Sequence, residues 1–141
     1  DILISTNKNL LDISMIHSYL KTSYWVPNIS YPKVVKSIKH SECFGVYKNA
    51  KQIGFARVIT DYTGFAYLAD VFILQEFRKN GYSKLLMEFI CQHPDIKGVR
   101  RFVLATSDAH TLYEQFGFTA LDYPEKFMQK MNPNFLKVGI S

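Results

Sequence analysis

The order of elements across residues 65–107 is the feature that most constrains the fold. "FAYLADVFIL" (65–74) is a strand-like apolar run, "SKLLMEFI" (83–90) has helical spacing, and "RFVLAT" (101–106) is strand-like again. Two strands joined through a helix pair in parallel when they share a sheet. The chain is therefore expected to contain a parallel pair inside a mixed sheet.

The residues before this unit predict antiparallel strands. "CFGVYK" (43–48) and "QIGFARVIT" (52–60) are joined by a short turn, and "DYTG" turns into the run at 65–74. "ILIST" is expected as a first strand, and "TALDY" (119–123) and "KFMQKM" (126–131) as the last two. Together these predict an α+β fold in one domain, residues 1–141. Its mixed, mostly antiparallel, twisted sheet has about six to seven strands and about four flanking helices.

Helical spacing predicts the remaining helices. Apolar residues from Leu10 to Leu20 follow a possible cap at Asn9. "YPKVVKSIKH" predicts a helix with Val34, Val35 and Ile38 inside, and "DAHTLYEQFGF" (108–118) a short amphipathic one that Gly117 can cap. In the helix at 83–90, one face is expected to carry Leu85, Leu86, Phe89 and Ile90.

Composition excludes several classes of protein. Hydrophobic residues make up 48% of the chain, which argues against disorder, and no apolar run approaches the ~20 residues that span a bilayer. The first residues resemble folded protein and not a signal peptide, so a cytoplasmic location is expected. Cys43 and Cys91 lack metal or CxxC spacing and are expected to be reduced thiols. The histidines form no cluster with cysteines or carboxylates in the sequence, so no metal is expected.

The net charge of +5 suits acidic ligands, phosphates or nucleic acid. The lysines at residues 33–39 could form a nucleic-acid surface, but no nucleic-acid motif supports this, and a solvated helix face explains them equally well.

The junction "RKNGYS" (78–83) lies between the strand at 65–74 and its helix. A helix N-terminus presents unpaired N–H groups and the positive end of its dipole, and a glycine lets a phosphate approach closely. Arg78 and Lys79 add charge beside Asn80 and Gly81. The junction is neither a P-loop nor a GxGxxG motif, so we predict a different pyrophosphate site here.

The pattern Arg78-x-x-Gly81-x-Ser83 resembles motif A of the GNAT acetyltransferases, and "LATSDAHTLYEQFGF" (104–118) resembles their motif B. The order of elements to about residue 131 fits as well, as in a bacterial branch of small members. The resemblance implies that acetyl-CoA is the cosubstrate, with no metal. It assigns cofactor binding to Val71, Phe72, Ile73, Arg78, Lys79, Asn80, Gly81, Tyr82, Ser83 and His110, although His110 could equally face only solvent.

The resemblance also implies catalytic roles. Tyr113 matches the general acid that protonates the CoA thiolate, although its spacing is equally that of a packed helix residue. The backbone at 71–73 would pair with the pantetheine amides, and one N–H there could stabilise the oxyanion. Where many members have an Asn that holds the pantetheine arm, this chain has Thr106, so that contact is not transferred.

Asp70 is the candidate base, acting directly or through water, or else a structural acceptor of hydrogen bonds. The histone-acetylating members carry a Glu where this chain has Tyr67, which is no base at neutral pH. Tyr24 and Trp25 could form a wall of the acceptor pocket, although Trp25 could equally anchor the core. Arg57 could bind an acidic substrate group or pair with Asp61 or Asp70.

The function expected is N-acetylation of a primary amine by direct attack in a ternary complex. The amine belongs to a small molecule, a peptide or a protein. A GNAT-like module that binds CoA without chemistry is the alternative. No membrane partner is expected, and the aromatic C-terminal stretch could support a homodimer.

Overall fold

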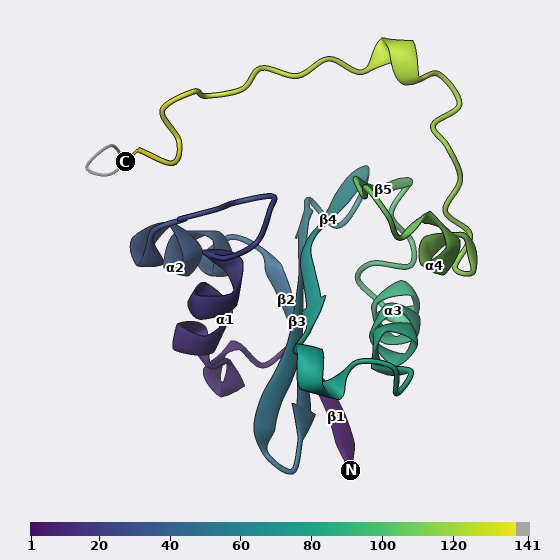
Figure 1. Cartoon of the computed structure of the whole chain (residues 1–141). Coiled ribbons are helices and arrows are strands. Elements are labelled where there is room, and N and C mark those ends of the chain that lie inside the picture. The colour runs from purple at the N-terminus through teal and green to yellow at the C-terminus, as the bar shows by residue number, and fades with distance from the viewer. Residues whose placement is uncertain (138–141) are drawn as a thin grey trace.

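A five-stranded mixed sheet forms the centre of the computed structural model, which describes residues 1–137 (Figure 1). The strands lie in the sheet in chain order: β1 (Ile2–Ser5), β2 (Glu42–Lys48), β3 (Lys51–Thr60), β4 (Phe65–Ile73) and β5 (Arg101–Leu104). The first four pair antiparallel, and β4 pairs with β5 in parallel. The parallel pair predicted from the strand–helix–strand order is confirmed.

Four α-helices within residues 1–137 cover the two faces of the sheet. α1 (Ile13–Leu20) and α2 (Tyr31–Lys39) lie on one face, and α3 (Tyr82–Gln92) and α4 (His110–Glu114) lie on the other (Figure 1). The described part of the chain also has three short 3-10 helices: η1 (Lys8–Leu10), η2 (Gln75–Phe77) and η3 (Pro124–Lys126). The predicted α+β class and the number of helices are confirmed.

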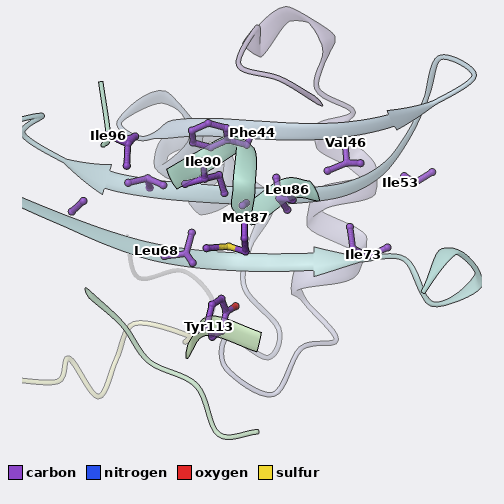
Figure 2. Close-up of a cluster of buried hydrophobic side chains, with 13 residues drawn as sticks. Phe44, Val46, Ile53, Leu68, Ile73, Leu86, Met87, Ile90, Ile96 and Tyr113 are labelled. Carbon is purple, nitrogen blue, oxygen red and sulfur yellow. The ribbon is translucent and has the colours of Figure 1, made fainter. Parts of the chain in front are cut away.

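Strands β2 and β3 are buried on both faces because helices pack on each side. Their side chains point alternately into two hydrophobic cores. Cys43 points into the core beneath α1 and α2, and its neighbour Phe44 points into the core beneath α3 and α4. Figure 2 shows the second core, which brings together Phe44, Val46, Ile53, Leu68, Ile73, Leu86, Met87, Ile90, Ile96 and Tyr113.

The two strands predicted at 119–123 and 126–131 do not form within the described residues, so the sheet has five strands and not six or seven. Every residue from 119 to 137 is exposed. Alternating apolar residues make a strand only when a neighbouring strand pairs with them, and no strand of the described residues pairs with these.

Three smaller predictions about the helices were wrong. Val35, Leu85 and Phe89 are exposed although their helices were expected to bury them, and Met87 is buried instead of Leu85. Apolar spacing predicts which face of a helix points inward, but it does not separate buried from exposed positions at the margin of that face.

The first helix begins at Ile13 and not after Asn9. The Asp12 carboxylate accepts a hydrogen bond from the Met15 N–H and caps α1, while Asn9 and Leu10 belong to η1. The N-cap of the first helix is therefore Asp12 and not the predicted Asn9.

Two turns fix the register of the meander. Asn49 and Ala50 both have positive φ, as a two-residue type I′ hairpin requires. After β3, the Asp61 carboxylate accepts hydrogen bonds from the N–H groups of Thr63, Gly64 and Phe65. These bonds lower the pKa of Asp61 below its usual value. Among the described residues, no helix is long and apolar enough to cross a membrane.

Candidate active site

The parallel pairing of β4 with β5 stops halfway along β4. The last paired residues are Leu68 and Leu104, but β4 continues to Ile73 with β3 as its strand neighbour. The chain after β5 turns away toward α4. The edge of β4 from Ala69 to Ile73 is therefore open toward α4, and it contains the backbone predicted to bind a pantetheine arm.

A β-bulge lies at the beginning of this open edge. Arg57 of β3 pairs with Ala69 and Phe55 pairs with Phe72, so Asp70 and Val71 together face one residue of β3. Asp70 has a φ of 56°, a left-handed conformation that costs a non-glycine residue about 1 kcal/mol or more. Strain of this kind persists where surrounding contacts hold it.

Both oxygens of the Asp70 carboxylate accept hydrogen bonds. Oδ2 accepts from Arg57 Nε at 2.9 Å, and Oδ1 accepts from the indole Nε1 of Trp25 at 2.9 Å. Arg57 also donates through Nη1 to Ser41 Oγ at 3.0 Å. The Asp70 side chain is only 7% exposed and that of Arg57 15%. Of the two carboxylates considered as partners of Arg57, Asp70 forms the ion pair. The Asp61 carboxylate instead accepts hydrogen bonds from backbone N–H groups of the turn that follows it.

The loop after α1 lies across the bulge. Trp25 reaches Asp70, and the Tyr24 hydroxyl lies 2.9 Å from Ser107 Oγ at the beginning of the α4 segment. The two rings touch edge to face, with centroids 5.1 Å apart, and both are exposed. Trp25 is thus no core anchor. The loop connects β4 to the segment before α4 through these two contacts.

Free backbone amides gather at the N-terminus of α3. Gly81 is the N-cap residue with φ 79°, and the Asn80 side chain fixes the loop by donating to the carbonyls of Phe77 and Arg78. Within residues 1–137, the N–H groups from Lys79 to Lys84 have no acceptor, and Leu85 is the first to donate into the helix. No atom lies within 4 Å of a Cβ built on Gly81, so the space is open. Amides arranged in this way suit phosphate oxygens.

Arg78 braces this loop against the end of β4. Its Nε donates to the Ile73 carbonyl at 2.9 Å and its Nη2 to the Tyr19 hydroxyl at 2.8 Å. Tyr19 in turn stacks on Phe72, with centroids 3.9 Å apart. The sequence reasoning missed Tyr19, whose helical spacing gave no sign that it contacts residues more than fifty positions away.

Tyr113 lies on α4 and is 9% exposed (Figure 2). The helix ends with a Schellman motif: Gly117 at φ 89° donates to Glu114, and Phe118 donates to the Tyr113 carbonyl. The Phe118 ring packs on the Tyr113 ring at 5.9 Å.

The environment of Tyr113 favours its protonated form. Burial raises the pKa of the Tyr113 phenol, and the nearby Tyr24 and Asp108 raise it further. Its hydroxyl has no hydrogen-bond partner among the described residues. A buried, protonated and unpartnered phenol is suited to donate a proton to a bound group.

The other predicted site residues have these positions. Tyr67 is half-buried in β4, opposite Val103 of β5. His110 is exposed at the first turn of α4, and the Tyr82 hydroxyl accepts from Lys48 Nζ at 3.3 Å. The Thr106 hydroxyl accepts from the Ala109 N–H, so it holds the chain before α4.

Folding brings together one group of possible metal ligands that the sequence did not indicate. Ligand atoms of Glu42, His93 and Asp95 lie within 4.8 Å of one another, brought together by folding. His93 Nδ1 already accepts from the Asp95 N–H. Both cysteines are free, and burial raises the pKa of the Cys43 thiol to about 11.

Comparison with known proteins decides the family. The family model described as "Acetyltransferase (GNAT) domain" matches residues 39–120, more than half of the chain. The chain belongs to the GNAT acetyltransferase family. A protein of Gibberella zeae named as a candidate acetyltransferase is 26% identical over 136 positions, covering 80% of this chain and 76% of that protein.

Solved structures agree with a GNAT-type acetyltransferase. The crystal structure of a candidate GNAT acetyltransferase from Xanthomonas campestris pv. campestris is 46% identical, covers 97% of both chains and has a TM-score of 0.93. Glucosamine-6-phosphate N-acetyltransferase from Arabidopsis thaliana is 14% identical with a TM-score of 0.63, covering 94% of this chain and 97% of that one. This second similarity shows the GNAT fold alone.

Proposed function

We propose that this protein transfers an acetyl group from acetyl-CoA to a primary amine by direct attack. The observation that carries the proposal is the run of free amides from Lys79 to Lys84, which follows directly on the open edge of β4. A ligand with a pyrophosphate at one end and an amide-bearing arm at the other matches these two features in order. Acetyl-CoA is such a ligand, and it supplies the activated acetyl group.

The loop and the strand would hold the cosubstrate at separate points. The amides around Gly81 would bind the pyrophosphate, with Lys79 and the α3 dipole adding positive potential. Arg78 would act mainly through the loop that it braces. The backbone at 71–73 would pair with the pantetheine amides, and one N–H there would stabilise negative charge on the acetyl oxygen. His110 would face the adenylate side.

Tyr113 would donate the proton that the departing thiolate needs. Its raised pKa keeps the phenol protonated at neutral and mildly alkaline pH, which is the form that a general acid requires. Neither cysteine is placed as a nucleophile, because burial raises the pKa of both thiols and Cys43 lies within the core. The amine would therefore attack without an acyl-enzyme.

The amine must lose a proton before it attacks. Asp70 stays our candidate base, and a proton taken up directly by its carboxylate would weaken the bonds that it accepts from Arg57 and Trp25. Relay through water is the alternative that leaves both bonds intact. Tyr24 and Trp25 would border an amine-bearing small molecule, peptide or protein, since aromatic faces attract cations before deprotonation. Tyr67 would line the same cleft from β4.

The test is calorimetric titration with acetyl-CoA and, separately, with acetyl-pantetheine, which lacks the pyrophosphate. We expect acetyl-CoA to bind far more tightly, and Gly81→Glu to abolish the difference by placing a carboxylate among the amides. Gly98→Glu is the matched control, since Gly98 also has open space around it but lies beyond α3. Equal binding of both ligands, or equal loss in both variants, would refute the phosphate site. Thiol release with a panel of amines then tests the transfer itself.

A further inference from the structure

One side chain of α1 contacts both parts of the proposed acetyl-CoA site. The Tyr19 hydroxyl accepts a hydrogen bond from Arg78 Nη2 at 2.8 Å, and Arg78 begins the loop whose amides would bind the pyrophosphate. The Tyr19 ring stacks on the Phe72 ring, with the ring planes only 9° apart. Phe72 is the middle residue of the strand edge that would bind the pantetheine arm. Tyr19 therefore links the loop and the strand from a third element of the fold.

Arg78 closes these contacts into a ring. Its Nε donates to the carbonyl of Ile73 at 2.9 Å, and Ile73 follows Phe72 as the last residue of β4. A guanidinium is planar and its N–H groups have fixed directions, so two bonds from one such group define its orientation. The bond to Tyr19 therefore fixes how Arg78 holds the loop against the end of the strand.

The two groups that hold Arg78 carry no charge. They are a phenol oxygen and a backbone carbonyl oxygen, and no carboxylate within residues 1–137 forms an ion pair with Arg78. The guanidinium has further N–H groups that find no acceptor among the described residues. Neutral acceptors orient a guanidinium without cancelling its charge, whereas a carboxylate would cancel it. The arrangement keeps positive charge beside a loop of free amides, which suits an anionic ligand.

Packing of α1 fixes the place of the Tyr19 side chain. Its helix neighbours Ile16 and Leu20 are buried in the core beneath α1 and α2. His17 Nε2 donates to the Ile29 carbonyl at 2.9 Å, so the helix is also tied to the far end of the loop that follows it. A free arginine side chain has many rotamers, and ordering it costs conformational entropy. A hydroxyl held by a packed helix can meet that cost before any ligand arrives.

We infer, on the basis of the proposed function, that Tyr19 is a positioning residue for the cosubstrate. It orients Arg78 and so sets the loop amides in register with the strand edge before acetyl-CoA binds. A ligand held at two points binds most tightly when both points are already in place, because ordering the site then costs no binding energy. Acetyl-CoA uses both points, whereas acetyl-pantetheine uses the strand edge alone. Loss of the Tyr19 hydroxyl therefore weakens the first ligand and spares the second.

The first test is calorimetric titration of the variant Tyr19→Phe with acetyl-CoA and, separately, with acetyl-pantetheine. This variant loses the hydroxyl and keeps the stack on Phe72. We expect the Kd for acetyl-CoA to rise about five- to tenfold, because binding must then order an arginine that the hydrogen bond no longer holds. The Kd for acetyl-pantetheine should change by less than about twofold. Tyr31→Phe is the matched control, since Tyr31 begins α2 on the same face of the sheet and its hydroxyl has no hydrogen-bond partner within the described residues.

The second test asks whether Tyr19 acts through Arg78. In an Arg78→Ala background, Tyr19→Phe should have no further effect on the Kd for acetyl-CoA, because the hydroxyl then has no guanidinium to orient. The urea midpoint of Tyr19→Phe should stay close to that of the wild-type chain, since the ring keeps its place and only a partly exposed hydroxyl is lost. A Tyr19 that served only the fold would instead lower the urea midpoint and weaken both ligands alike.

The possible results separate the positioning role from the proposed function. If the wild-type chain prefers acetyl-CoA over acetyl-pantetheine and Tyr19→Phe keeps that preference in full, the positioning role is overturned and the proposed function stands. Equal weakening of both ligands in Tyr19→Phe, or effects that add to those of Arg78→Ala, also overturns the positioning role. A wild-type chain that binds both ligands equally overturns the phosphate site, and the role of Tyr19 with it.

Discussion

The ion pair between Asp70 and Arg57 allows a quantitative prediction. Replacing Asp70 with Ala removes two hydrogen bonds, from Arg57 Nε and from the Trp25 indole. Arg57 is 15% exposed and keeps only Ser41 as a partner, so its charge is left poorly compensated. A hydrogen bond to a charged group contributes about 1.5–3 kcal/mol, and removing one partner of a shielded pair costs more.

We expect Asp70→Ala to lower the free energy of unfolding by about 3 kcal/mol. Trp25 is 38% exposed, so water can replace its lost acceptor and its contribution is small. Alanine keeps the strained φ of 56°, so no strain is relieved. At about 2–4 °C per kcal/mol for a chain of this size, the midpoint of thermal unfolding should fall by about 6–12 °C.

The assay is a double-mutant cycle of Asp70→Ala and Arg57→Ala, followed by urea unfolding at one protein concentration. Trp25 is the only tryptophan, so its fluorescence reports directly on the loop that Asp70 holds. We expect a coupling energy of about 2 kcal/mol. Asp61→Ala is the control, because that exposed carboxylate holds only its own turn and should not couple to Arg57. A coupling of about 0.5 kcal/mol or less would show that the pair does not hold the bulge.

Three further outcomes are expected. Tyr113→Phe should lower kcat by about 10²–10⁴ while leaving the Kd for acetyl-CoA nearly unchanged, measured by thiol release and calorimetry; unchanged turnover would remove the general-acid role. Leu86→Ala should destabilise the fold by about 3 kcal/mol, and its exposed neighbour Leu85→Ala by less than about 1, in urea titrations. The pKa of the Cys43 thiol is about 11 in the folded protein, against 9.0 for an unperturbed thiol. The folded state therefore gains about 2–3 kcal/mol below pH 9, and it loses this stabilisation as the pH rises toward 11. Cys43→Ala should flatten that alkaline decline, and an unchanged slope would contradict it.

Part of the local geometry of the candidate site could be predicted from the sequence. Gly81 before an apolar helix identified the N-terminal cradle, and the order of strand, helix and strand identified the parallel pair. The cap depends on neighbours within a few positions, and the parallel pair follows from the order of elements along the chain. Tyr113 was identified through the resemblance of its surroundings to motif B, since its helical spacing alone would equally fit a packed residue.

Most side-chain contacts between residues distant in sequence could not be predicted. Tyr24 meets Ser107, Trp25 meets Asp70, and His93 meets Glu42 only after the sheet has formed. The positive φ of Asp70 has no local signature, because the bulge arises from the register between β3 and β4. The predicted C-terminal strands were wrong for a related reason, since strand formation needs a pairing partner.

The long connection between β4 and β5 has a consequence for folding and for exchange of amide hydrogens. β1 to β4 are antiparallel, and two tight turns join β2, β3 and β4, so β2 to β4 can form from contacts close in sequence. β5 must close a loop that runs from Ile73 to Arg101 before its four paired positions form. We therefore expect the β4–β5 ladder to open before the rest of the sheet, with faster amide exchange. A ligand that contacts both β4 and the segment after β5 would stabilise this ladder and slow its amide exchange more than that of the other strands.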